Sequence, residues 1–197
     1  MKKEANNKEL NMPTTSQLEQ ELHRERYKFR YKKLLSSTVY TLLIVVAISV
    51  LVATLIFPVL QIYGKSMSST LKENDIVVSV KQSKFEQGDI IAFYYNNRIL
   101  VKRVIATSSE WVNIDEDGNV FVNDKLLNEP YIEEKYLGET DIKYPYQVPE
   151  GSYFVLGDER ELSIDSRVSE ISSVKEEDII GRIVFRVWPI KRFGIVN

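Results

Sequence analysis

The chain contains no cysteine and only one histidine, His23, among its 197 residues. The lack of cysteine excludes disulfide bonds and thiolate chemistry. His23 precedes the only long apolar stretch, so a membrane-spanning role for that stretch would separate the histidine from nearly all of the remaining chain. A Ser-His-Asp triad and a histidine-based zinc site are then excluded from the main domain. The bases that remain available are lysine, tyrosine and the carboxylates.

Charged residues are absent between Lys33 and Lys65. The central part of this interval, residues 38–60, rises about 1.5 Å per residue as a helix and is long enough to cross a hydrocarbon layer of roughly 30 Å. We therefore predict a transmembrane helix over residues 34–60. A cleaved signal peptide would have a shorter apolar region followed by a small-x-small site. A buried helix of a soluble core is the other alternative, but an uncharged run of this length is unusual there.

Basic residues are concentrated before the apolar segment. Nine basic and five acidic residues occur through Lys33, against seventeen and twenty-three beyond it. The positive-inside rule places residues 1–33 in the cytoplasm and residues after about 61 outside, in a single-pass plasma-membrane protein. Residues 14–33 have a helical pattern, with Thr14 or Ser16 as the cap. This short cytoplasmic helix either rests on the inner membrane surface or is a solvated segment that sets topology.

The pattern beyond residue 61 changes to short apolar runs separated by turn residues, which predicts a mainly β extracytoplasmic domain over residues 61–197. Expected strands cover residues 75–80, 89–95, 99–105, 111–114, 120–122, 153–156 and 179–187. Residues 107–150 contain most of the turns and acidic residues, so we expect a small β excursion there. The excess of acidic residues gives no reason to expect nucleic-acid binding.

Ser66 follows the expected membrane exit by a few residues, where a membrane-embedded substrate would present its scissile bond. Gly64 just before it allows close backbone approach, as an oxyanion site built from backbone N–H groups requires. A serine in such a position can equally be an ordinary turn residue.

Lys102 interrupts an apolar strand and shares one face with Leu100 and Val104. It is either an edge lysine that reaches water or a buried amine. Burial would lower its pKa, and a neutral amine can take the proton from a serine hydroxyl.

A third segment, residues 157–167, is rich in hydrogen-bonding groups. Ser163 is a hydroxyl that can orient an amine, and Asp165 can form an ion pair with Arg167 or Arg103. The alternative is a charged surface turn with several ion pairs.

These segments together resemble the bacterial type I signal peptidase family, in its Gram-positive form with a single anchor. The order is an apolar anchor, then Gly64-Lys65-Ser66-Met67, Gly88-Asp89-Ile90-Ile91-Ala92-Phe93, Val101-Lys102-Arg103-Val104-Ile105, and Gly157-Asp158-x-Arg160-x-x-Ser163-x-Asp165-Ser166-Arg167. The resemblance covers residue 38 to the end, and the last motif is the most specific.

The resemblance implies a β-rich Ser/Lys peptidase without metal or cofactor. It implies that Ser66 is the nucleophile and Lys102 the general base, that Ser163 holds the Lys102 amine, and that the site is stabilised by Asp165, Arg103 and Arg167, with Gly64 beside the oxyanion. The implied substrates are signal peptides of exported preproteins, cut after a small-x-small sequence such as Ala-x-Ala. Membrane lipid and the secretion translocon are the further partners expected.

Three departures from the family pattern occur. Ser69 replaces a proline, Glu159 replaces an asparagine, and residues 106–110 replace a Gly-x-Pro-Gly-Asp motif. All the implied catalytic side chains are retained. The alternatives are a client-specific signal-peptidase-like factor for pilus or surface-protein assembly, a β-rich adhesin with an exposed Lys102, and a Ser/Lys autoproteolytic repressor. The apolar segment and the lack of a DNA-binding motif oppose the repressor.

Overall fold

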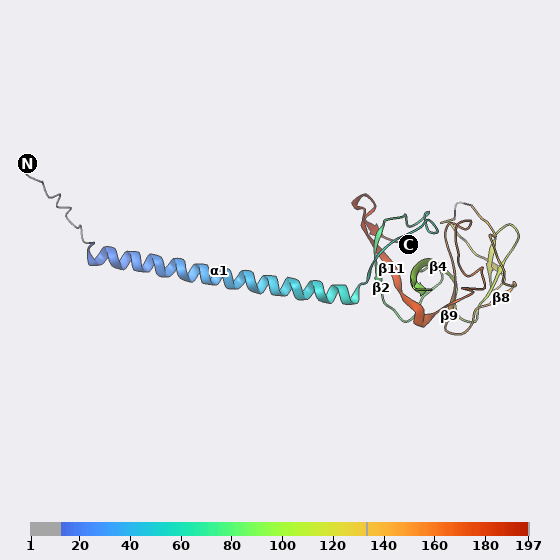
Figure 1. Ribbon diagram of the computed structural model, residues 1–197, viewed down its shortest axis with the longest axis horizontal. Coiled ribbons are helices and arrows are strands. Elements are labelled where there is room, and N and C mark those ends of the chain that lie inside the picture. The colour runs from blue at the N-terminus through green and yellow to red at the C-terminus, as the bar shows by residue number, and fades with distance from the viewer. Residues whose placement is uncertain (1–12, 133, 197) are drawn as a thin grey trace, which may run out of the picture. The chain divides into compact units, whose positions relative to one another are not determined.

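The computed structural model describes residues 13–132 and 134–196, apart from the side chains of Thr54 and Leu55. One long helix precedes a part built almost entirely of strands (Figure 1). The chain divides into two units, residues 1–52 and 53–197. The predicted fold class, mainly β with one N-terminal helix, is confirmed. The first twelve residues of the expected cytoplasmic segment lie outside the described residues.

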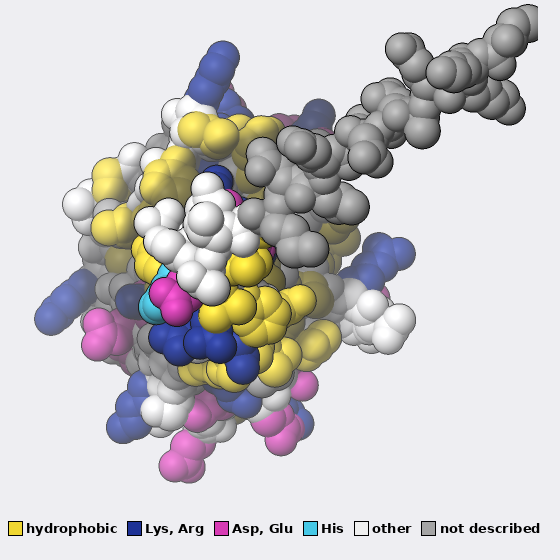
Figure 2. Space-filling model, turned by 90° about the vertical axis from the view of Figure 1, so that its left-hand side faces the viewer, with side chains coloured by type: hydrophobic (Ala, Val, Ile, Leu, Met, Phe, Trp, Pro, Cys, Tyr) yellow, Lys and Arg dark blue, Asp and Glu magenta, His cyan; other side chains and the backbone are white. Residues whose placement is uncertain are grey.

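Helix α1 runs from Thr15 to Ile56, which at 1.5 Å per residue makes it about 60 Å long. The Thr14 N–H donates to Gln17 Oε1 at 2.9 Å, which is one half of a capping box and explains the start of the helix. All of its described side chains are exposed. Figure 2 is viewed from the end at which α1 begins, and it shows charged side chains and apolar side chains, drawn in yellow, exposed on the same face. Within residues 13–132 and 134–196, this is the one helix long and apolar enough to cross a membrane.

The helix ends at Ile56 rather than at residue 60, and strand β1 begins at Val59. Pro58 accounts for the change because it lacks the N–H that a helix would use. β1, Val59–Gln61, pairs antiparallel with β2, Ile76–Val80. The segment that leads to Ser66 therefore already belongs to a sheet.

The larger sheet has the strand order β1-β2-β11-β3-β4-β9-β10, with β12 added beside β11. Its further strands are β3 (Ile90–Tyr95), β4 (Arg98–Ala106), β9 (Ser152–Leu156), β10 (Val174–Lys175), β11 (Ile179–Trp188) and β12 (Gly194–Ile195). Short 3-10 turns cover Glu176–Asp178 and Ile190–Arg192. Asn96 and Asn97 both have positive φ and close the two-residue β3–β4 turn, a hairpin geometry that asparagine tolerates. This hairpin carries Lys102 opposite Ile91.

A second sheet has the order β7-β6-β5-β8. It is formed by β5 (Trp111–Ile114), β6 (Val120–Val122), β7 (Lys125–Leu126) and β8 (Tyr146–Gln147), within the range where the sequence predicts a β excursion. Alternate residues of β5 are buried, as expected for a sheet with one covered face. Val112 and Val120 of this sheet share a core cluster with Ile105 of β4 and Phe154 of β9. The second sheet thus packs against the strands that flank the site.

A separate apolar cluster lies beneath the turn that contains Ser66. Met67 and Leu71, on this turn, are 2% and 0% exposed. They pack with Val77 of β2 and with Ile90 and Ala92 of β3. Burial of two large side chains contributes several kcal/mol and fixes the turn on the sheet.

Candidate active site

Ser66 lies in a tight turn just beyond β1. Gly64 before it has φ of +85°, a conformation that favours glycine. The Ser68 N–H donates to the Lys65 carbonyl at 3.1 Å, and the Leu71 N–H donates to the Met67 carbonyl at 2.6 Å. The turn holds the half-buried Ser66 side chain toward β4.

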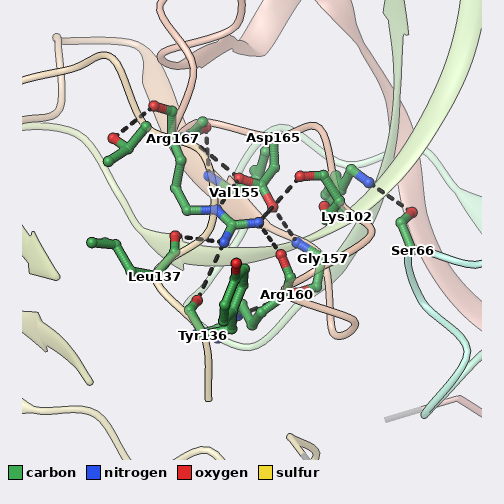
Figure 3. A network of polar contacts seen from close by, with 12 residues as sticks. Ser66, Lys102, Tyr136, Leu137, Val155, Gly157, Arg160, Asp165 and Arg167 are labelled. Atoms are coloured by element: carbon green, nitrogen blue, oxygen red, sulfur yellow. Dashed lines mark hydrogen bonds and ion pairs between the residues drawn. The ribbon is translucent and has the colours of Figure 1, made fainter. Parts of the chain in front are cut away.

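Lys102 is 3% exposed, so the alternative of an edge lysine that reaches water is wrong. Its Nζ lies 2.7 Å from Ser66 Oγ, within hydrogen-bond distance (Figure 3). Burial lowers the pKa of Lys102 to about 8, an effect that the nearby Asp165 carboxylate partly opposes. A substantial fraction of this amine is therefore neutral near pH 8, which is the form that can accept a proton.

Asp165 and Arg167 form a buried ion pair behind Lys102. Arg167 Nε donates to Asp165 Oδ1 at 2.8 Å, and both side chains are at most 2% exposed. The guanidinium of Arg167 also donates to the carbonyls of Leu137, Arg160 and Ser163 (Figure 3). These hydrogen bonds join Arg167 to the connection between β7 and β8 and to the loop that follows β9, and they hold that loop in place.

Arg103 pairs with Asp158 and not with Asp165. Arg103 Nε and Nη2 donate to the two Asp158 oxygens at 2.9 and 2.8 Å. The same carboxylate accepts from Thr70 Oγ1 at 2.6 Å, and Arg103 also lies 3.9 Å from the centre of the Tyr131 ring. Arg103 therefore connects β4 to the turn that carries Ser66, whereas the ion pair of Asp165 is with Arg167.

Ser163 lies beside Gly157, opposite the Ser66 backbone. A Cβ added to Gly157 would meet the Ser163 side chain and would come within 2.6 Å of the Ser66 carbonyl oxygen. Ser163 Oγ is buried and has no hydrogen-bond partner among the described residues. The expected contact with the Lys102 amine is not formed in this structure, so the role of Ser163 stays a prediction.

An open groove extends from Ser66 along two strands. β1 and the residues up to Met67 line one side, and residues 97–101 at the start of β4 line the other. Its volume is about 780 Å³, which places it within the range of ligand sites. Gly64 lies in its wall with nothing within 4 Å of the position of a Cβ. The lining residues come from two extended segments, between which an extended peptide could lie.

Sequence reasoning missed the partners of two residues that depart from the family pattern. Ser69 Oγ donates to Glu159 Oε1 at 2.9 Å, so the two departures contact each other. The Glu159 N–H also donates to the Ser66 carbonyl at 3.0 Å. These contacts join the Ser66 turn to the loop after β9, and only their shared departure from the motifs could have signalled the pairing.

A third buried ion pair was also missed. Glu129, in the connection between β7 and β8, accepts from Arg160 Nη2, and both side chains are at most 1% exposed. Glu129 lies outside every motif, so no local pattern could have identified its partner.

Comparison with known proteins places the chain in a family. Residues 35–188 match the family model described as signal peptidase, peptidase S26. Signal peptidase IB of Staphylococcus aureus is 32% identical over 182 residues, which are 82% of this chain and 94% of that protein. Signal peptidase I of Streptococcus pneumoniae is 30% identical over 173 residues, 68% of this chain and 83% of that one.

Two further matches are partial. Thylakoidal processing peptidase 1 of Arabidopsis thaliana is 34% identical over 73% of this chain, and the matched part is 46% of that protein's length. The crystal structure of a signal peptidase I from Enterococcus faecalis is 33% identical, with a TM-score of 0.43, and the match covers 50% of this chain and 96% of that one. The match of the family model to most of the chain decides the assignment. The chain belongs to the signal peptidase family, peptidase S26, and the predictions of a bacterial type I signal peptidase and of a serine peptidase are confirmed.

Proposed function

We propose that this chain removes signal peptides from exported preproteins by cutting after a small-x-small sequence, with Ser66 as the nucleophile and Lys102 as the general base. The observation that carries the proposal is the 2.7 Å approach of the buried Lys102 amine to Ser66 Oγ. A buried lysine that pairs with no carboxylate among the described residues is costly for stability, and its pKa near 8 suits proton transfer at working pH.

The first half of the reaction forms an ester. The substrate lies extended in the groove between β1 and the start of β4. Neutral Lys102 takes the proton of Ser66 Oγ as this oxygen attacks the scissile carbonyl carbon. The backbone N–H of Ser66 and a group near Gly64 stabilise the oxyanion. The carbon–nitrogen bond then breaks, and the Lys102 ammonium donates its proton to the leaving amine.

The second half hydrolyses the ester. Lys102, neutral again, takes a proton from a water molecule, and the resulting hydroxide attacks the ester carbon. The bond between that carbon and Ser66 Oγ breaks, and Ser66 recovers its proton from Lys102. Atoms and charge balance without a metal or cofactor.

Ser163 supports the amine during both halves. Its buried hydroxyl has no partner among the described residues and lies beside Gly157, the residue after β9. An unpartnered buried hydroxyl is costly, so a hydrogen bond to Lys102 during the reaction would satisfy it. Asp165 and Arg167 hold the loop that carries Ser163.

We attribute the proposed specificity for small side chains to the groove beside Ser66. Apolar residues such as Ile62, Met67 and Val101 line this groove, and contact with them would favour alanine over a charged side chain. We further propose that residues 1–33 are cytoplasmic, that the apolar part of α1 within residues 34–60 crosses the plasma membrane, and that residues 61–197 are extracytoplasmic. Membrane lipid then surrounds the apolar part of α1, and the translocon delivers the substrate.

Cleavage of a preprotein with an Ala-x-Ala site by the full chain in detergent tests the proposal. The matched substrate carries glutamate in place of the last alanine, and Ser66→Ala is the control enzyme. The proposal expects wild type to cut only the first substrate, after the last alanine by N-terminal sequencing of the product. Cleavage elsewhere, or equal cleavage of both substrates, contradicts the small-x-small rule. Lack of cleavage of several such preproteins by folded wild type would favour a client-specific factor instead.

A further inference from the structure

Glu129 is remote from the Ser66–Lys102 pair in sequence, yet a short series of contacts leads from it to the site. Glu129 follows β7, in the connection to β8 of the second sheet. Its side chain is 0% exposed and accepts from Arg160 Nη2. Tyr131 Oη also donates to Glu129 Oε1 at 3.1 Å. The second sheet thereby supplies the counter-charge for an arginine of the loop after β9.

Arg160 in turn forms a hydrogen bond with Gly157. Arg160 Nε donates to the Gly157 carbonyl at 3.2 Å, and the Gly157 N–H donates to Asp165 Oδ2 at 3.0 Å. Both polar backbone groups of Gly157 are therefore held by hydrogen bonds, the carbonyl by Arg160 and the N–H by Asp165. The β4–β9 register, in which Arg103 pairs with Leu156, carries the next residue, Gly157, toward Lys102.

The position of Gly157 determines how closely two parts of the site approach each other. The space for a Cβ on Gly157 is filled by the Ser163 side chain and by the Ser66 carbonyl. A shift of Gly157 would therefore move Ser163, the Ser66 backbone, or both. Displacements of about 1 Å at a catalytic centre can lower the rate by as much as roughly 100-fold.

We propose that Glu129 is a positioning residue of the peptidase site, which acts through the guanidinium of Arg160 on Gly157. This proposal rests on the function proposed for Ser66 and Lys102. It assigns a catalytic purpose to the second sheet, whose connection between β7 and β8 holds the loop after β9 through Arg160.

The fold around Glu129 has independent support, so its substitution need not unfold the site. Arg167 Nη1 donates to the carbonyls of Tyr136 and Leu137, and a Cβ on Gly138 would clash with the Arg167 guanidinium. Tyr136 also contacts the turn at Gly118, where a Cβ would come within 2.6 Å of the Tyr136 nitrogen. These contacts hold the connection between β7 and β8 in place and do not involve Glu129.

The test compares Glu129→Gln, Arg160→Gln and the double variant with wild type on the Ala-x-Ala preprotein. Active sites are counted with a reagent that acylates Ser66, so that kcat refers to folded, competent enzyme. We expect each single variant to lower kcat by roughly 10-fold to 100-fold with little change in KM. The double variant should be no slower than either single variant, because the two residues act as one unit.

Glu110→Gln is the matched control. Glu110 belongs to the same excursion and accepts from Thr107 and Asn123, but it has no contact with the loop after β9 in these hydrogen bonds. The kcat of Glu110→Gln should equal that of wild type. Normal kcat per titrated site in Glu129→Gln, or effects that multiply in the double variant, would overturn the proposal. If the single variant yields no titratable sites, the double variant decides, because it leaves no unpaired buried charge: a wild-type kcat there overturns the proposal.

The control outcomes separate this inference from the function on which it rests. If wild type fails to cut the preprotein, the proposed function fails. If wild type cuts and Ser66→Ala does not, while Glu129→Gln turns over normally, only the positioning role is wrong.

Discussion

Lys102 Nζ lies 2.7 Å from Ser66 Oγ, although the two residues are 36 positions apart in the sequence. The strand β4 supplies one and a turn beyond β1 supplies the other. The close approach depends on the burial of Met67 and Leu71 beneath the turn and on the Arg103–Asp158 pair beside it. The geometry of the pair is therefore a property of the packed domain.

Activity should rise with pH through the pKa of Lys102. Because the protonated amine cannot act as a base, kcat/KM should be low at pH 6 and should increase with a midpoint near 8 in the free enzyme. Peptide cleavage measured from pH 6 to pH 10 gives this profile. A rate that is constant or falling between pH 6 and pH 8.5 would be inconsistent with an amine base.

Lys102 should also make folding stability depend on pH. Its pKa is about 8 when folded against 10.5 as the reference value, so the folded state releases the proton first as pH rises. The unfolding free energy of wild type should increase between pH 8 and about pH 10.5, relative to Lys102→Met, by on the order of 3 kcal/mol. Denaturant titrations of both proteins across this range measure the difference. A difference that does not vary with pH would mean that the amine has its ordinary pKa.

Gly157→Ala should lower the catalytic rate more than it lowers the stability of the folded domain. The new methyl group would be within 2.6 Å of the Ser66 carbonyl and would meet the Ser163 side chain. We expect a loss of kcat of roughly 100-fold, since small displacements at a catalytic centre have effects of this size. Gly151→Ala is a stringent control, because nothing lies within 4 Å of its Cβ position and its backbone, with φ of +68°, carries a penalty that Gly157 does not have. Equal activity of the two variants would show that Gly157 tolerates a side chain.

Asp158→Asn should lower stability substantially. The substitution leaves the 3% exposed Arg103 without its counter-charge, and breaking a buried pair in this way costs about 3–5 kcal/mol. Thermal unfolding of the full chain in detergent measures the loss. Glu177→Gln, which removes an exposed pair with Lys175, should change little. Similar midpoints for the two variants would contradict the assigned strength of the Arg103–Asp158 pair.

Local sequence patterns predicted much of the β part. The expected strands at residues 111–114 and 120–122 agree with β5 and β6, and the strand expected at 89–95 differs from β3 by one residue at its start. Strands β7, β8, β10 and β12 have only two residues each, too short to produce an alternating pattern. Pairing with a distant strand, not local preference, creates them.

The site was also predicted only in part, because local patterns identify candidate residues but not their distant partners. Motif order brought Ser66 and Lys102 to attention, and the structure brings them into contact. Arg103 illustrates the limit: the sequence suggested Asp165 as its acidic partner, whereas the structure pairs it with Asp158. Only the β4–β9 register and the turn at Thr70 select Asp158. Glu129 lies outside any motif and is brought to Arg160 by the fold of the second sheet.

The most direct test of the Ser66–Lys102 mechanism is the cleavage rate per folded molecule of wild type, Ser66→Ala and Lys102→Met on one preprotein at pH 8.5. Folding of each protein is verified by its thermal unfolding midpoint. The mechanism predicts that wild type cuts and that both variants lose at least about 1,000-fold, as expected when residues that act as a unit are removed. Wild-type rates in folded Lys102→Met would contradict it, because the base would then be another group.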